Sequence, residues 1–157
     1  MFDNGELTES GQFVQQGKEH GEKLCNFLLF LYQLFQVMEP TDTVFEAPYA
    51  GRRRFTYGVL SKYVGLVELA HFHCLQREIP AENKVAAHAV KRIIGVPKGI
   101  SHDENKRLMV AEMNRIYGLA LKYKSNDRTK KVTEDDRADA IAVGRAWLLK
   151  YHEDWVD

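Results

Sequence analysis

The stretch Asp136-Arg137-Ala138-Asp139-Ala140-Ile141-Ala142 begins the last helical segment and decides how the fold is interpreted. The surrounding pattern predicts a helix from Glu134 to about Tyr151. Two carboxylates three residues apart lie on one face of a helix, with Cβ atoms about 5–6 Å apart. Acids in a first helical turn also complement the helix dipole, which is the ordinary structural explanation of such a pair. Taken alone, the pair leaves both a structural and a functional role open.

A third carboxylate belongs to a different part of the chain. Glu46 lies near the end of a short apolar strand predicted over Thr43–Pro48, and strand ends commonly carry the chemistry of an α/β sheet. Three converging acids without other partners would repel one another unless divalent cations lay between them. Mg²⁺ prefers oxygen ligands and keeps positions for water and phosphate, and a pair of such ions promotes phosphodiester cleavage. Glu46, Asp136 and Asp139 therefore predict a magnesium site, with Mn²⁺ as a substitute ion.

The rest of the chain alternates helical and extended patterns, which predicts one α/β domain over residues 1–157. A helix over 18–38 is expected to pack a broad apolar face on a sheet. Its apolar part, 24–38, is too short and too polar to span a bilayer. Packing on a sheet is favoured over the alternative of a helix on a membrane surface, so no membrane partner is expected. Further helices are predicted over about 55–76, 89–94 and 103–117, and strands over 6–14 and 84–87.

Asp3-Asn4-Gly5 is a hairpin signal, because these residue types accept the positive φ that tight turns require. A hairpin needs a strand on each side of its turn, and only Met1 and Phe2 precede this one. The first strand of the structural unit is therefore expected to lie upstream of Met1.

Gly58 and Gly65 lie seven residues apart in the helix predicted over 55–76. Glycines at this spacing fall on the same side of a helix and leave one face smooth. Such a face suits close packing against another helix, including a helix from a second subunit. The spacing thus indicates a helix–helix contact.

Length and composition bound the class of protein. The chain has 157 residues, of which 45% are apolar and 28% charged, which is ordinary globular composition. Cys25 and Cys74 are too few for a disulfide scaffold, which favours a reducing compartment. No secretion signal is visible, so a cytoplasmic location is predicted. Cys25 lies in an apolar helical segment and is expected in the core.

The charges are segregated although they cancel overall, with 22 basic and 22 acidic side chains. Residues 1–49 carry two basic and eight acidic side chains, and residues 133–157 carry three and seven. The middle of the chain carries 17 basic and seven acidic side chains, a net charge of +10. This distribution suits a basic face beside an acidic pocket, while solvated helix faces are the plainer alternative.

Three segments resemble, in order and spacing, motifs of the RuvC-like Holliday junction resolvases, and most nearly the small phage or prophage branch of that family. Residues 136–142 look like the segment D-x-A-D-A-[LI]-A of the family's last helix. Residues 43–49 look like the strand that carries the family's glutamate, with an aromatic residue three positions later. Residues 85–91 resemble a strand-to-helix segment that ends in Val-Lys before a glycine turn, here at Gly95. The similarity covers nearly the whole chain.

The resemblance implies a ribonuclease-H-like fold, with a mixed sheet flanked by helices, and a homodimer in the cytoplasm of a bacterial host. The implied activity is symmetrical nicking of four-way DNA junctions with Mg²⁺. Glu46, Asp136 and Asp139 would bind the metal. Lys91 would lie near the scissile phosphate as a further catalytic residue, and Tyr49 would stack on bases.

Four basic residues are predicted phosphate contacts from charge alone: Arg52, Arg53, Arg54 and Lys98. Lys106 competes with Lys98 for the position of the family's lysine. The family's first catalytic acid, an aspartate on the first strand, would lie upstream of Met1, so an N-terminally incomplete domain with weakened catalysis is expected. Asp3 is the nearby substitute, although a turn aspartate commonly serves its turn. The alternatives are a non-catalytic junction binder and another ribonuclease-H-like nuclease acting on branched DNA or RNA.

Overall fold

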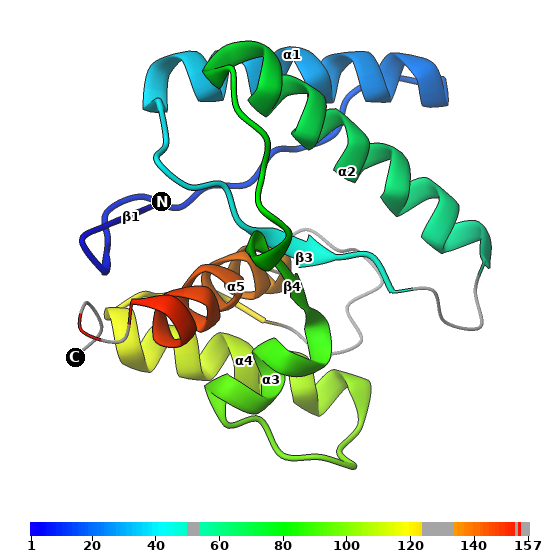
Figure 1. The fold of residues 1–157 in the computed structure, drawn as a ribbon. Helices are drawn as coiled ribbons and strands as arrows, with labels where there is room; N and C mark the ends of the chain where they lie inside the picture. Colours follow the sequence, from blue (N-terminus) through cyan, green and yellow to red (C-terminus); the bar gives the residue numbers. More distant parts are fainter. Residues whose placement is uncertain (50–53, 124–133, 153, 155–157) are drawn as a thin grey trace. The chain divides into compact units, whose positions relative to one another are not determined.

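The computed structural model describes residues 1–49, 54–123, 134–152 and 154 (Figure 1). The chain forms two compact units, one of Phe13–Lys84 and one of Met1–Gln12 together with Val85–Asp157. Helices dominate the described residues, and every described strand belongs to a two-stranded sheet. The predicted mixed α/β class is confirmed, but the described strands form no larger mixed sheet. The single-domain organisation stays a prediction.

Two long helices make up most of the Phe13–Lys84 unit. α1 spans His20–Met38 and α2 spans Arg54–Leu75, so both helices predicted here are confirmed. They pack on each other, with Leu31, Phe35 and Ala70 buried between them. The prediction that α1 packs on a sheet is wrong, because α2 presents an apolar stripe of its own. None of the described helices is long and apolar enough to cross a membrane.

Aromatic side chains extend the core between α1 and α2. Phe13 stacks on Phe30 with ring centroids 4.6 Å apart, and Phe27 meets Tyr63 edge to face at 5.2 Å. Cys25 is exposed, so the prediction that it lies in the core is wrong. The side of α1 that meets α2 is formed by residues at helical spacing around Leu31 and Phe35, and Cys25 is not among them.

Polar contacts fix the chain after α2. The buried His71 donates from Nδ1 to the carbonyl of Arg77 at 2.9 Å. The buried Asn83 donates from Nδ2 to the carbonyl of Thr43 at 3.2 Å. A short 3₁₀ helix, η1 (Ala81–Asn83), leads into β4 (Lys84–Ala86), which confirms the strand predicted over 84–87. The strand predicted over Thr43–Pro48 is confirmed in shorter form as β3 (Phe45–Ala47).

The other unit begins with a small hairpin. β1 (Phe2–Asp3) and β2 (Glu6–Leu7) pair antiparallel, with Phe2 opposite Leu7. Asn4 and Gly5 have φ values of 47° and 87°, the pair of positive angles that a two-residue hairpin turn needs. The predicted turn is therefore confirmed. The strand predicted over 6–14 is wrong beyond Leu7, because β1 offers only two residues for pairing.

Three helices complete this unit: α3 (Ala87–Ile94), α4 (His102–Tyr117) and α5 (Asp135–Tyr151). The start of α4 is capped by Ser101, whose Oγ accepts a hydrogen bond from the Glu104 amide at 3.2 Å. α3 and α4 both pack on α5. α5 is correspondingly the most buried helix, and small residues such as Ala138 and Ala142 have no exposed surface. The packing of α3 and α4 therefore holds α5 in place.

Candidate functional site

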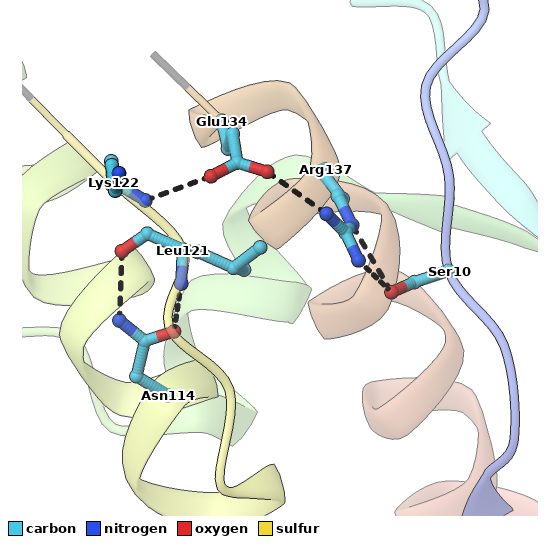
Figure 2. Close-up of polar contacts among 6 residues, drawn as sticks. All are labelled: Ser10, Asn114, Leu121, Lys122, Glu134 and Arg137. Carbon is cyan, nitrogen blue, oxygen red and sulfur yellow. Dashed lines mark hydrogen bonds and ion pairs between the residues drawn. The ribbon is translucent and has the colours of Figure 1, made fainter. Parts of the chain in front are cut away.

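Two hydrogen bonds tie the beginning of α5 to the segment that follows α4, and Figure 2 shows the one that ends on the Glu134 carboxylate. The Glu134 amide donates to the Lys122 carbonyl at 2.8 Å, and the Lys122 amide donates to Glu134 Oε2 at 3.1 Å. Arg137 donates to the other carboxylate oxygen of Glu134 at 2.8 Å, and to Ser10 Oγ at 2.8 and 3.1 Å. These contacts set where α5 starts and thus where its acids lie.

The segment after α4 is itself clamped to that helix. Asn114 donates from Nδ2 to the Leu121 carbonyl, and the Leu121 amide donates to Asn114 Oδ1, both at 2.9 Å (Figure 2). Two residues further on, the Tyr123 hydroxyl donates to Asp103 Oδ1 at 2.6 Å. This hydrogen bond to the carboxylate raises the pKa of Tyr123 to about 12. Tyr123 therefore stays protonated and holds Asp103 at the start of α4.

Three aspartates on the first turns of α5 occupy different environments. Asp135 is buried, Asp136 is exposed and Asp139 is half-buried. Burial raises the pKa of Asp139, and the charges of Asp135 and Asp136 raise it further, while Lys106 and Lys91 act in the opposite direction. Asp139 thus holds its proton more tightly than an ordinary aspartate. Asp136 and Asp139 both lie on α5, which confirms that they share one helix.

Lys106 is the cation placed among these acids. Its ammonium pairs with Asp135. Partial burial lowers the pKa of Lys106, but the bond to Asp135 and the charges of all three aspartates raise it above its ordinary value. Sequence reasoning named Lys106 only as a competitor to Lys98 and missed Asp135 and Asp103. The adjacent acids Asp135 and Asp136 were a visible signal, but the choice of partner depends on how α4 packs against α5.

The other predicted site residues have varied positions. Glu46 is exposed in β3, and Tyr49 follows with 80% of its surface exposed, both in the Phe13–Lys84 unit. Lys91 is half-buried on α3, and Lys98 is exposed between α3 and α4. Arg54 begins α2, while Arg52 and Arg53 lie outside the described residues. The structure thus brings Asp136 and Asp139 together with Lys91 and Lys106 in one unit, and Glu46 belongs to the other.

The residues present fit a magnesium ion in type and number. Mg²⁺ in proteins is commonly bound by one or two carboxylates and keeps several waters. Asp136 is exposed, so its carboxylate would be accessible to a hydrated ion, and Asp139 lies one helical turn away on the same helix. No group of three or more histidine, cysteine or acidic side chains suited to a metal ion occurs within the described ranges. Within this unit, the hypothesis of a metal site therefore rests on two carboxylates, those of Asp136 and Asp139.

Comparisons with known proteins add no relative to this picture. No family model matches the sequence, and searches of curated proteins and of solved structures found no match either. The functional interpretation therefore depends on the motifs in the sequence and on the environment of the aspartates at α5.

Proposed function

We propose that this chain is a Mg²⁺-dependent, structure-specific endonuclease that nicks four-way DNA junctions. The observation that carries the proposal is the pair Asp136 and Asp139 at the start of α5, one exposed and the other half-buried with a raised pKa. The proposed fold is the ribonuclease-H-like form of the α/β class. The proposed protein is a homodimer in the cytoplasm of a bacterial or phage-infected cell.

The charges around α5 support a phosphodiester substrate. Asp136 and Asp139 would hold the ion, with Glu46 as a third proposed ligand. When bound, Mg²⁺ supplies an activated water and stabilises charge on the leaving oxygen. Lys91 acts electrostatically on Asp139, so a phosphate drawn to an ion held by the aspartates would meet this ammonium as well. Tyr49 and Lys98, both exposed, are proposed DNA contacts together with the arginines at 52–54.

A cleavage assay on a labelled four-way junction tests the proposal directly. The protein is incubated with Mg²⁺, Mn²⁺, Ca²⁺ or a chelator, with unlabelled junction, flap, duplex or RNA–DNA hybrid as competitor. We expect nicks at symmetrical positions with Mg²⁺ or Mn²⁺, none with the chelator, and the strongest competition from the junction. Cleavage that the flap or the hybrid competes best would instead indicate another ribonuclease-H-like nuclease.

The second candidate function is a junction-binding protein without catalysis. It is favoured by the lack of a group of three metal-ligating side chains in the part of the chain that the structure describes. The basic middle of the chain would serve this function equally well. Tight junction binding without cleavage under any of the metal conditions would support this candidate over the nuclease.

A further inference from the structure

A buried amide holds the short segment that leads from α1 into β3. Asn83, which is 1% exposed, donates from Nδ2 to the Thr43 carbonyl at 3.2 Å and to Asp42 Oδ1 at 3.4 Å. Thr43 lies two residues before β3 and three before Glu46. The side chain of Asn83 therefore fixes the backbone just ahead of the carboxylate that is the third proposed metal ligand.

A second hold acts on the same segment nearer to α1. The Arg77 guanidinium donates to the Pro40 carbonyl, and the Arg77 carbonyl in turn accepts from Nδ1 of His71 at 2.9 Å. His71 belongs to α2 and is 2% exposed, so Arg77 is anchored to that helix. We name His71, Arg77 and Asn83 the α2 clasp. Its hydrogen bonds reach both ends of the segment 40–43.

The clasp acts where packing around the segment is incomplete. A cavity of about 70 Å³ lies beside the segment, and all three residues of the clasp line it. Among the described residues, Thr43 Oγ1 is a buried oxygen that has no hydrogen-bond partner. Atoms that line a cavity lack contacts on that side, so dispersion holds them less firmly than atoms in a filled core. The hydrogen bonds of the clasp therefore contribute much of the hold on the segment.

We propose that Asn83 is the positioning residue for Glu46: through the Thr43 carbonyl it sets where β3 begins and hence where the Glu46 carboxylate lies. The inference rests on the proposed function, in which Glu46 binds Mg²⁺. Mg²⁺ demands near-ideal octahedral geometry, so a misplaced carboxylate binds it poorly. Groups that orient a metal ligand without touching the ion commonly contribute about 10–100-fold in metal affinity or activity.

The position of Asn83 requires a hydrogen-bond donor. Both of its partners, the Thr43 carbonyl and the Asp42 carboxylate, are acceptors. Asn83→Asp keeps the shape of the side chain but places a carboxylate against them, so it should release the segment. Arg77→Met is the milder second variant, because Arg77 is exposed and the change removes only the bond to Pro40 and the charge.

Cleavage of the labelled junction over a range of Mg²⁺ concentrations separates position from stability. Asn83→Asp should raise the Mg²⁺ concentration for half-maximal cleavage by about tenfold, with a smaller effect on the rate at saturating Mg²⁺. Leu28→Ala is the matched control, because it loosens the packing of α1 on α2 and leaves the clasp intact. It should lower the thermal midpoint without changing the Mg²⁺ requirement. An unchanged requirement in a folded Asn83→Asp protein, or in Arg77→Met where Asn83→Asp does not fold, would overturn the proposal.

A double variant tests whether Asn83 acts through Glu46. Once Glu46→Gln has removed the ligand, the position of β3 no longer matters for the ion. The double variant of Glu46→Gln and Asn83→Asp should therefore need no more Mg²⁺ than Glu46→Gln alone. Additive increases in the Mg²⁺ requirement would mean that Asn83 acts elsewhere, and would overturn its role as the positioning residue for Glu46.

Backbone order parameters from nuclear magnetic resonance separate a failure of this inference from a failure of the nuclease proposal, because they need neither metal nor DNA. The amides of Phe45–Ala47 should give values near 0.85 in the wild type, typical of rigid backbone, and fall toward about 0.6 in Asn83→Asp. Glu82→Gln, an exposed neighbour on η1, should leave them unchanged. A wild type that cuts no junction would overturn the proposed function, while a fall confined to Asn83→Asp would still support the hold on β3. Unchanged order parameters in Asn83→Asp would overturn the positioning role whether or not the protein cleaves DNA.

Discussion

The ammonium of Lys106 on α4 pairs with the carboxylate of Asp135, the first residue of α5. Their side chains are 28% and 9% exposed, so the pair lies mostly inside the protein. It joins two helices that pack together, and it places a positive charge beside Asp136 and Asp139. The same ion pair therefore contributes to the packing of α4 on α5 and to the charge balance of the candidate site.

Removal of the Lys106 charge should destabilise the protein. Lys106→Met keeps the aliphatic stem but takes the charged hydrogen-bond donor away from the buried Asp135. Hydrogen bonds to charged groups contribute about 1.5–3 kcal/mol, so the free energy of unfolding should fall by about that amount. Urea unfolding at neutral pH measures it, with Lys98→Met as the control because Lys98 is an exposed lysine. Equal losses in the two variants would contradict a structural role for the pair.

Asp139 should be needed for cleavage but not for junction binding. Asp139→Asn keeps the size of the side chain and removes a negative charge that would otherwise hold a cation. Cleavage of the labelled junction should be abolished, while binding stays the same or becomes tighter because a charge that repels phosphate is gone. Gel-shift and cleavage assays on the same preparation separate the two effects, with Glu82→Gln as an exposed acidic control. Full cleavage by Asp139→Asn would remove this residue from the metal hypothesis.

The arginines at positions 52–54 should contribute to the salt dependence of DNA binding. Three phosphate contacts account for a slope of roughly 2.7 in a plot of log affinity against log salt. Replacement of all three arginines by alanine should weaken junction binding and flatten the slope by up to that amount. Arg115→Ala serves as the control, because Arg115 pairs with Glu112 on α4. An unchanged slope in the triple variant would place these arginines away from the DNA.

The helices were predictable from the sequence because long amphipathic patterns identify them strongly. α1, α2, α4 and α5 begin and end within a few residues of the predicted bounds. The strand over 6–14 failed because a strand depends on a partner, and β1 offers only two residues. The packing of α1 on α2 was also missed, since an apolar stripe does not say whether a helix or a sheet will cover it.

The candidate site shows the same division. Asp136 and Asp139 were found because their spacing is local, and it remains local in α5. The contacts from Lys106 to Asp135 and from Tyr123 to Asp103 join residues 29 and 20 positions apart, so tertiary packing decides them. The role of Glu46 stays a prediction that cleavage by a Glu46→Gln variant would test.

His71 should make the stability of the protein depend on pH. Burial lowers the pKa of His71 below its ordinary value of 6.5, and the charge of Arg77 also lowers it, while the bond to the Arg77 carbonyl and the charge of Asp42 act in the opposite direction. The unfolded chain therefore takes up a proton that the folded chain resists. The contribution of His71 is fully present above pH 6.5 and is lost as the pH falls from there through the folded pKa.

Urea midpoints measured from pH 8 to about pH 5 should therefore decline below pH 6.5, near the ordinary pKa of histidine. His71→Gln, which cannot become protonated, should lose part of this decline, although it starts from a lower stability. His88→Gln should keep the decline, because His88 is an exposed histidine on α3. If the His71→Gln variant kept the full decline, the pH dependence would have to come from other groups.

The ring of Phe2 should leave no room for a side chain at position 144, so that only glycine fits there. A Cβ atom at Gly144 would lie 2.5 Å from Phe2 Cε2, well inside contact distance. Alanine is otherwise favoured over glycine in a helix by about 1 kcal/mol. Gly144→Ala should therefore lower the free energy of unfolding when Phe2 is present and raise it in a Phe2→Ala background. Urea unfolding of the wild type, the two single variants and the double variant gives this reversal of sign as a coupling energy. If Gly144→Ala stabilises both backgrounds, the β1–β2 hairpin moves aside at little cost, and the contact between Phe2 and α5 is not a fixed part of the core.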